Sequence, residues 1–109
     1  MQYRRLGKSG LEVSEVGLGT NNFGSRMEYA VAAAVIDHAI DLGVTYIDTA
    51  PGYVNAHRQL GAVLRLRRDE VFLVTKTQVD TADDALRVLE KGLEDLQTDH
   101  VDLVYVHHM

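Results

Sequence analysis

Hydrophobic residues form four short runs, separated by longer segments in which apolar positions recur at helical spacing. Most of these runs are rich in β-branched and aromatic residues, as is typical of buried parallel strands. We expect strands at 16–19, 46–48, 71–76 and 101–107. Because a helical segment lies between each strand and the next, the pattern predicts parallel strands joined by right-handed crossovers.

Three helices are predicted between these strands. Ser25 and Glu28 match the S-x-x-E capping box ahead of a helix that stops at Gly43. Asn55 is expected to cap a second helix, and Thr81 opens a third. The apolar residues expected to face the core are Leu60, Val63 and Leu64 in the second helix and Leu86, Leu89, Leu93 and Leu96 in the third.

The first 24 residues have a different pattern, with five glycines and two short runs of alternating apolar and polar residues. The runs at 3–6 and 11–16 flank the turn-forming sequence GKSG at 7–10. This arrangement predicts an N-terminal β-hairpin that precedes the parallel strands.

Side chains alternate between the two faces of a strand, so the sequence also assigns the faces of the sheet. One face is expected to carry Tyr46, Asp48, Phe72, Val74, Lys76, Leu103, Tyr105 and His107. The opposite face is expected to carry Ile47, Leu73, Val104 and Val106, which would pack against the helices. Large and polar side chains opposite aliphatic ones fit a barrel interior better than an open sheet. The fold class is therefore α/β, as the N-terminal half of a (β/α)₈ TIM barrel with an N-terminal hairpin.

Composition narrows the class of protein further. The 109 residues are 46% hydrophobic and 25% charged, which suits one globular domain over 1–109. A formal charge of -5 disfavours nucleic acid or an anionic membrane as a partner, although a local basic pocket remains compatible with it. With no cysteine there is no disulfide or thiolate metal site, and we expect no bound metal. No apolar run approaches the roughly 20 residues of a membrane span, so we expect a cytoplasmic protein.

Three successive strands end in ionisable residues, namely Asp48, Lys76 and His107, and Tyr53 follows the first of them. Each has an ordinary structural explanation on its own: the aspartate can cap a turn, the lysine can be solvated, and His107 or His108 can be a satisfied polar residue. Adjacent parallel strands lie about 4.8 Å apart, however, and their carboxyl ends converge on one mouth of a barrel. We therefore expect the four side chains to form one site.

The chemistry of this set suits proton transfer to a carbonyl. A free tyrosine has a pKa near ~10, and a neighbouring ammonium group favours its phenolate form. Lys76 would supply that charge, and Asp48 would keep the lysine charged and fixed. Strand alternation selects His107 over His108 as the inward histidine, which would bind the substrate oxygen. With no sign of a nucleophile elbow or a metal cluster, the set indicates proton transfer coupled to hydride transfer from a cofactor.

Four separated segments, YRRLGKSGLEVSEVGLGTNNFG, DTAPGY, VFLVTK and VDLVYVHH, together resemble the N-terminal half of an aldo-keto reductase, over essentially the whole chain. The resemblance implies a (β/α)₈ barrel whose bottom is plugged by the hairpin. It also implies NADPH-dependent reduction of aldehydes or ketones, with hydride from the nicotinamide and a proton from the tyrosine. The family's catalytic aspartate, tyrosine, lysine and histidine fall on Asp48, Tyr53, Lys76 and His107.

The resemblance extends to the cofactor, NADPH (NADP⁺), whose nicotinamide is expected near Gly19, Thr20 and Asn21, with Asp48 also touching it. The family commonly has glycine and then glutamate after the tyrosine, where this chain has Val54 and His57. The partner would be a small-molecule carbonyl substrate.

The sequence reaches only the fourth strand of a fold that needs about 250 residues. We therefore expect the remaining half-barrel or an oligomeric partner to be required, because the strands at 16–19 and 101–107 would otherwise be open edges. Two other functions stay open: a non-catalytic half-barrel module that retains the four residues without binding cofactor alone, and a barrel relative with isomerase or lyase chemistry.

Overall fold

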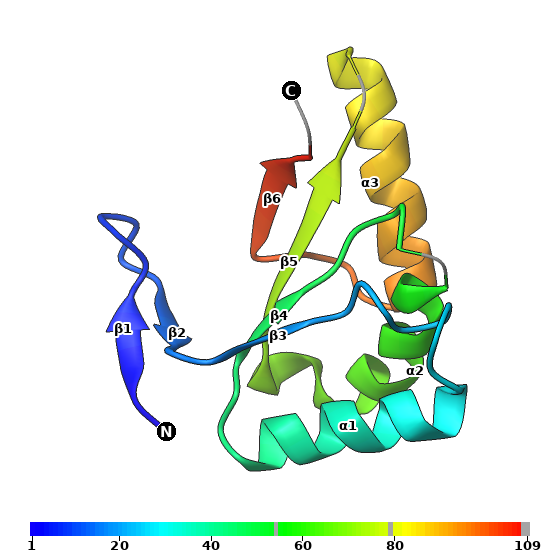
Figure 1. The fold of residues 1–109 in the computed structure, drawn as a ribbon. Coiled ribbons are helices and arrows are strands. Elements are labelled where there is room, and N and C mark those ends of the chain that lie inside the picture. Colours follow the sequence, from blue (N-terminus) through cyan, green and yellow to red (C-terminus); the bar gives the residue numbers. More distant parts are fainter. Residues whose placement is uncertain (54, 79, 108–109) are drawn as a thin grey trace.

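A parallel sheet lies at the centre of the computed structural model, which describes residues 1–53, 55–78 and 80–107 (Figure 1). Val54 and His108, which the sequence analysis singled out, lie outside the described residues. The elements in chain order are β1 Tyr3–Arg5, β2 Glu12–Ser14, β3 Gly17–Gly19, α1 Tyr29–Asp41, β4 Tyr46–Asp48, α2 Ala56–Arg67, the 3₁₀ turn η1 Arg68–Glu70, β5 Phe72–Thr77, α3 Ala82–Leu96 and β6 Leu103–Val106.

The strand order of the sheet follows the order of the chain, β3-β4-β5-β6, and every pairing within it is parallel. The register places Gly19 beside Asp48, Asp48 beside Val74, and Lys76 beside Tyr105. Strands β1 and β2 form a separate antiparallel hairpin. The predicted hairpin and the predicted series of parallel strands are both confirmed.

The two faces of β4 and β5 carry the side chains that strand alternation predicted. Val104 and Val106, which were predicted to pack against the helices as well, are 38% and 64% exposed, because β6 is the outer strand of the sheet. Ile47 and Leu73 are fully buried in a cluster with apolar residues of α1, α2 and α3. On the other face, Phe72 and Val74 pack with Val13 of the hairpin. The hairpin therefore packs against part of this face, and Ser14 joins it to the residue before β4 through hydrogen bonds of 2.9 Å in both directions with Thr45.

The predicted capping box at the start of α1 is wrong. Glu28 takes the N-cap position with extended backbone, and within the described residues its side chain makes no capping hydrogen bond. Phe23, which is 4% exposed, is buried in the helix-side core, and its backbone N–H donates to the carbonyl oxygen of Thr20 at 2.9 Å. This anchoring holds the segment before α1 in a turn, so Ser25 does not reach the N-cap position. The predicted stop is confirmed, since Gly43 follows the helix with a φ of 94°.

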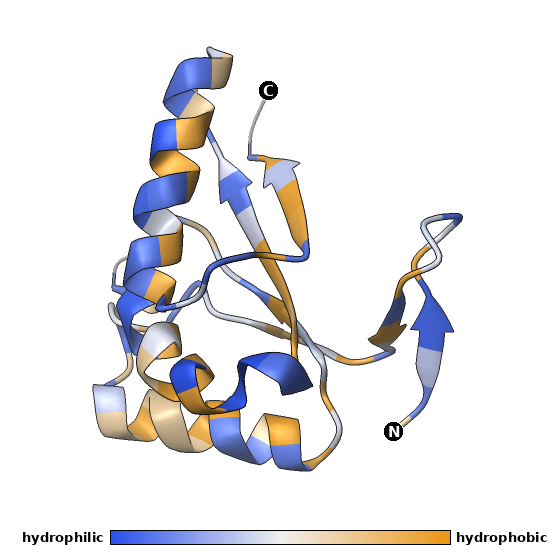
Figure 2. Ribbon diagram, turned by 180° about the vertical axis from the view of Figure 1, so that it is seen from behind, coloured by the Kyte–Doolittle hydropathy of each residue, from blue (hydrophilic) through white to orange (hydrophobic). Residues whose placement is uncertain are grey.

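The buried residues of α2 match its periodicity, whereas those of α3 match it only in part. Leu60, Val63 and Leu64 are buried as predicted, and the Thr81 hydroxyl caps α3 by accepting from the N–H of Asp84. Of the four leucines predicted to face the core from α3, only Leu96 is buried; Leu89 and Leu93 are half-buried, and Leu86 is 57% exposed. Hydrophobic and hydrophilic bands alternate along this helix in Figure 2. In the described ranges, no helix is both long and apolar enough to cross a membrane.

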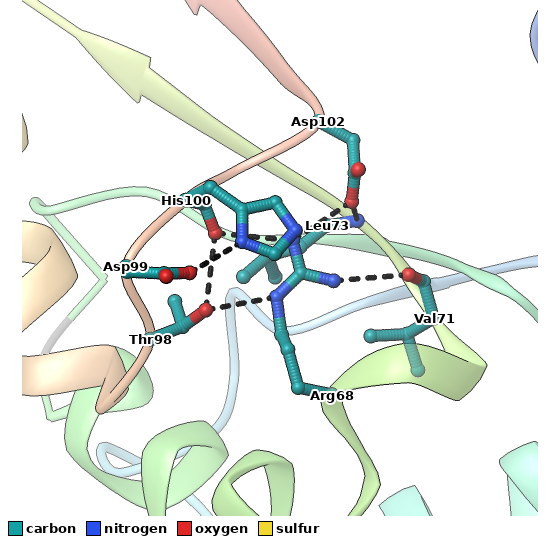
Figure 3. Close-up of polar contacts among 7 residues, drawn as sticks. All are labelled: Arg68, Val71, Leu73, Thr98, Asp99, His100 and Asp102. Carbon is teal, nitrogen blue, oxygen red and sulfur yellow. Dashed lines mark hydrogen bonds and ion pairs between the residues drawn. The ribbon is translucent and has the colours of Figure 1, made fainter.

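Arg68 joins the amino ends of β5 and β6 (Figure 3). Its guanidinium, on a side chain that is 12% exposed, donates to oxygen atoms of Val71, Thr98, His100 and Asp102 over 2.9–3.1 Å. The same Asp102 oxygen accepts a 2.7 Å hydrogen bond from the backbone N–H of Leu73. Because Asp102 joins the arginine to β5, this network fixes the register of the two strands whose opposite ends carry Lys76 and His107.

Candidate active site

Lys76 is the centre of the polar cluster at the carboxyl ends of the strands. Its Nζ lies 2.9 Å from both carboxylate oxygens of Asp48 and 2.9 Å from the carbonyl oxygen of Thr49. Asp48 pairs in register with Val74, so Lys76 lies two residues further along the same face of β5 and reaches back to the end of β4. The lysine side chain is only 12% exposed, so the carboxylate compensates a charge that is largely withdrawn from water.

Tyr53 reaches the same ammonium group from the loop after β4. Its backbone N–H donates to the carbonyl oxygen of Ala50 at 3.1 Å, which closes a tight turn through Pro51 and Gly52. The hydroxyl oxygen lies 3.2 Å from Lys76 Nζ, and Nζ lies 4.8 Å from the centre of the phenol ring. The structure thus brings a phenol into direct contact with a lysine that a carboxylate holds in place.

His107 joins the cluster from the strand next to β5. Its backbone N–H donates to the carbonyl oxygen of Thr77 at 2.6 Å, so parallel pairing continues one residue past β6. The imidazole approaches the phenol ring of Tyr53 edge-on, with 5.9 Å between ring centres and an angle of 88° between the planes. All four residues selected from the sequence therefore meet at one end of the sheet.

A second phenol on the inner face, Tyr46, has a different environment. It stacks on Phe72 with 5.7 Å between ring centres, and its hydroxyl lies 3.4 Å from that of Tyr105. Burial, the contact with Tyr105 and the charge of Asp48 all raise the pKa of Tyr46 above its ordinary value. This phenol therefore keeps its proton at neutral pH.

Of the three residues expected near a nicotinamide, Gly19 and Thr20 lie beside Asp48, and the three differ in exposure. Thr20 is fully buried, and both its N–H and its hydroxyl donate to the Asp48 carbonyl oxygen, at 3.0 and 2.9 Å. Its hydroxyl thus holds the ends of β3 and β4 together. Gly19 and Asn21 are exposed, and a Cβ added at Gly19 would meet nothing within 4 Å. Exposed surface at Gly19 therefore adjoins Asp48, its partner in the register of β3 and β4.

His57 is a buried residue near the site for which the sequence analysis gave only its difference from the family. It is 6% exposed, and its Nε2 lies 3.2 Å from the hydroxyl oxygen of Thr75, the residue before Lys76. Burial lowers the pKa of His57 to about 4, with Asp95 raising it and Lys76 lowering it further. Its helical spacing from Leu60 and Leu64 is the signal that would have shown it facing the core.

Comparison with known proteins identifies the family. The aldo/keto reductase family model matches residues 15–109. The chain is 34% identical to the aldo-keto reductase YhdN of Bacillus subtilis, over 98% of this chain and 38% of the relative. PA4992 of Pseudomonas aeruginosa, named as an aldo-keto reductase, has a similar structure, with a TM-score of 0.89, 38% identity, and coverage of 97% of this chain and 47% of that one.

An aldo/keto reductase of Klebsiella pneumoniae, solved in complex with NADP and acetate, is 34% identical, with a TM-score of 0.79 over 90% of this chain and 36% of that one. The chain spans about two-fifths of the length of the curated relatives that it matches. Hairpin, sheet and helices correspond to the N-terminal half of their (β/α)₈ TIM barrel. The chain therefore belongs to the aldo/keto reductase family.

Proposed function

We propose that the protein reduces an aldehyde or ketone, with Tyr53 as the proton donor and NADPH as the source of hydride. The observation that carries the proposal is the contact of the Tyr53 hydroxyl with Lys76 Nζ at 3.2 Å, inside a cluster that Asp48 anchors. The NADP complex of the Klebsiella pneumoniae relative supports a nicotinamide cofactor. Membership of the family supports a carbonyl substrate.

Each residue of the cluster has a task in this reaction. Tyr53 gives its proton to the carbonyl oxygen, and the Lys76 ammonium stabilises the phenolate that remains. Asp48 and the Thr49 carbonyl fix the position of Nζ, so no reorganisation of the lysine is needed during proton transfer. His107 donates to the substrate oxygen, which its position beside the phenol ring allows. Asp48 is thus a positioning residue for the lysine.

The residues at the end of β3 fit the cofactor that this chemistry requires. Gly19 presents exposed surface beside Asp48, Asn21 is exposed two residues further along the chain, and the absence of a side chain at Gly19 leaves room for a flat ring. When bound, a nicotinamide supplies hydride to the carbonyl carbon. Thr20 would support this surface without contacting the cofactor through its hydroxyl, because that hydroxyl donates to the Asp48 carbonyl oxygen.

The alternative of a module without activity on its own has a specific observation in its favour. Val104, Tyr105 and Val106 of β6 are 38%, 42% and 64% exposed, although they continue the central sheet. Further polypeptide or an oligomeric partner would cover this strand edge. We therefore assign the proposed activity to the full-length product of the gene, and tests should use that protein.

Replacing Tyr53 with phenylalanine in the full-length product tests the proposal directly. Tyr53→Phe should lower kcat for carbonyl reduction by roughly 100-fold or more, because it removes the proton donor. NADPH binding, measured by fluorescence, should be nearly unchanged, since the substitution removes no proposed cofactor contact. Tyr46→Phe is the matched control and should keep most of the activity. Near-normal turnover in Tyr53→Phe would show that another group is the acid.

A further inference from the structure

A cleft of about 530 Å³ lies between α3 and the segment that joins β4 to α2. Tyr53, Asn55 and Arg58 belong to one wall, and Arg87 and Lys91 of α3 belong to the other. Tyr53 therefore lines this cleft with part of its side chain while its hydroxyl contacts the lysine of the candidate active site. The cleft lies outside the four-residue cluster but adjoins it through the tyrosine.

The charge of this cleft is opposite to that of the chain as a whole. Among its described lining residues, Arg58, Arg87 and Lys91 are cationic and Asp95 is the one carboxylate, whereas the complete sequence has a formal charge of -5. Asp95 lies 3.2 Å from Lys91 Nζ and 3.8 Å from Arg58 Nε, so it bridges cations from both walls. Arg87 is paired with Asp84, one turn earlier in α3. One carboxylate on the wall thus orients two cations and leaves positive charge uncompensated.

The remaining polar groups of the wall do not cancel this charge. His57 lines the cleft as a neutral ring, held on its inner side by Thr75. The first turn of α2, which includes Arg58, contains no acidic residue, and all of its residues are described. The positive end of the α2 dipole therefore adds to the field of the side chains.

We propose that this cleft binds the phosphate or carboxylate group of an anionic small molecule between Arg58 of α2 and Lys91 of α3. Guanidinium and ammonium groups on facing walls suit several oxygens of one anion. The anion has two conceivable sources with the same chemistry: a free inorganic anion, or the acidic end of a carbonyl substrate whose reacting end lies at Tyr53. The second source rests on the proposed function, whereas binding itself does not.

Titration calorimetry with inorganic phosphate, at constant ionic strength set by chloride, tests the binding in the full-length product. Wild-type protein should show saturable binding, and Arg58→Gln and Lys91→Gln should each weaken it by about tenfold, the effect of one charge-assisted hydrogen bond. Both side chains are largely exposed, at 71% and 59%, so the substitutions should leave the fold intact. Arg65→Gln, an exposed position of the same helix outside the cleft, makes the same charge change and should bind as wild type.

The absence of saturable phosphate binding in wild type, or equal weakening by Arg65→Gln, overturns the proposal. A kinetic comparison then identifies the source of the anion, using glyceraldehyde and glyceraldehyde 3-phosphate, which differ only in the phosphate. If the cleft holds the acidic end of a substrate, Lys91→Gln should lower the ratio of kcat/KM for the phosphorylated to the plain aldehyde by about tenfold. If it holds a free anion, Lys91→Gln should weaken phosphate binding while this ratio stays at the wild-type value. Failure of the proposed reductase activity would leave the calorimetric result intact.

Discussion

Acidification should destabilise the protein through His57, because this buried histidine is neutral in the folded state. Burial lowers its pKa from 6.5 to about 4, and the nearby charges that act on it are Asp95 of α3 and Lys76 of β5. The unfolded chain takes up a proton below pH 6.5, whereas the folded chain resists doing so until about pH 4. The stabilising contribution is therefore complete above pH 6.5 and is lost as the pH falls toward 4.

The size of the effect follows from the shift in pKa. The full difference corresponds to about 3 kcal/mol of unfolding free energy, of which about 2 kcal/mol is lost between pH 7 and pH 5. Because the ring is 6% exposed and contacts Thr75, His57→Gln offers an amide that can still reach the hydroxyl but does not titrate. The variant should consequently lose less stability than wild type over the same pH interval.

Urea unfolding of the full-length product at pH 7 and pH 5 measures this difference. Subtracting the loss in His57→Gln from the loss in wild type removes the contribution of the carboxylates and other histidines, and the remainder should be about 2 kcal/mol. His100→Gln, at an exposed histidine, is the control and should behave as wild type. Equal pH dependence in wild type and His57→Gln would refute the reasoning, because it would mean that the buried ring does not control the acid sensitivity.

Three further substitutions test other parts of the structure. Lys76→Met should slow alcohol oxidation with NADP⁺ by roughly 100-fold or more and recover partly toward about pH 10, where a phenol ionises unaided; a flat pH profile would contradict this electrostatic role. Asp102→Ala should lower the urea-unfolding free energy by about 2 kcal/mol, since it removes the carboxylate that pairs with the largely buried Arg68 guanidinium, and an unchanged midpoint would show that the network contributes little. In the same assay, Gly61→Ala should lower the unfolding free energy by about 1–3 kcal/mol, because the added Cβ would overlap the carbonyl oxygen of Asp95. This clash should outweigh the preference of alanine for helices. Greater stability of the variant would mean that α2 and α3 can separate at little cost.

The sequence alone determined the features that depend on local geometry. The order of parallel strands and the burial of Ile47 and Leu73 followed from patterns that repeat every second residue. The stop at Gly43 and the cap at Thr81 followed from residues within one helical turn. The meeting of Asp48, Tyr53, Lys76 and His107 could be predicted as well, because adjacent parallel strands bring their carboxyl ends together whatever lies between them.

Contacts between distant parts of the chain decided the rest. The capping box at Ser25 failed because burial of Phe23 overrode a local preference. Arg68 follows α2 and Asp102 precedes β6, and the two side chains meet across 34 positions of sequence. The environment of His57 depends on the packing of α2 against β5 and α3, which buries its ring. The same packing brings Arg58 and Lys91 to facing walls of one cleft. Such features depend on which surfaces meet in three dimensions, and periodicity within one element carries no information about the surface of its neighbour.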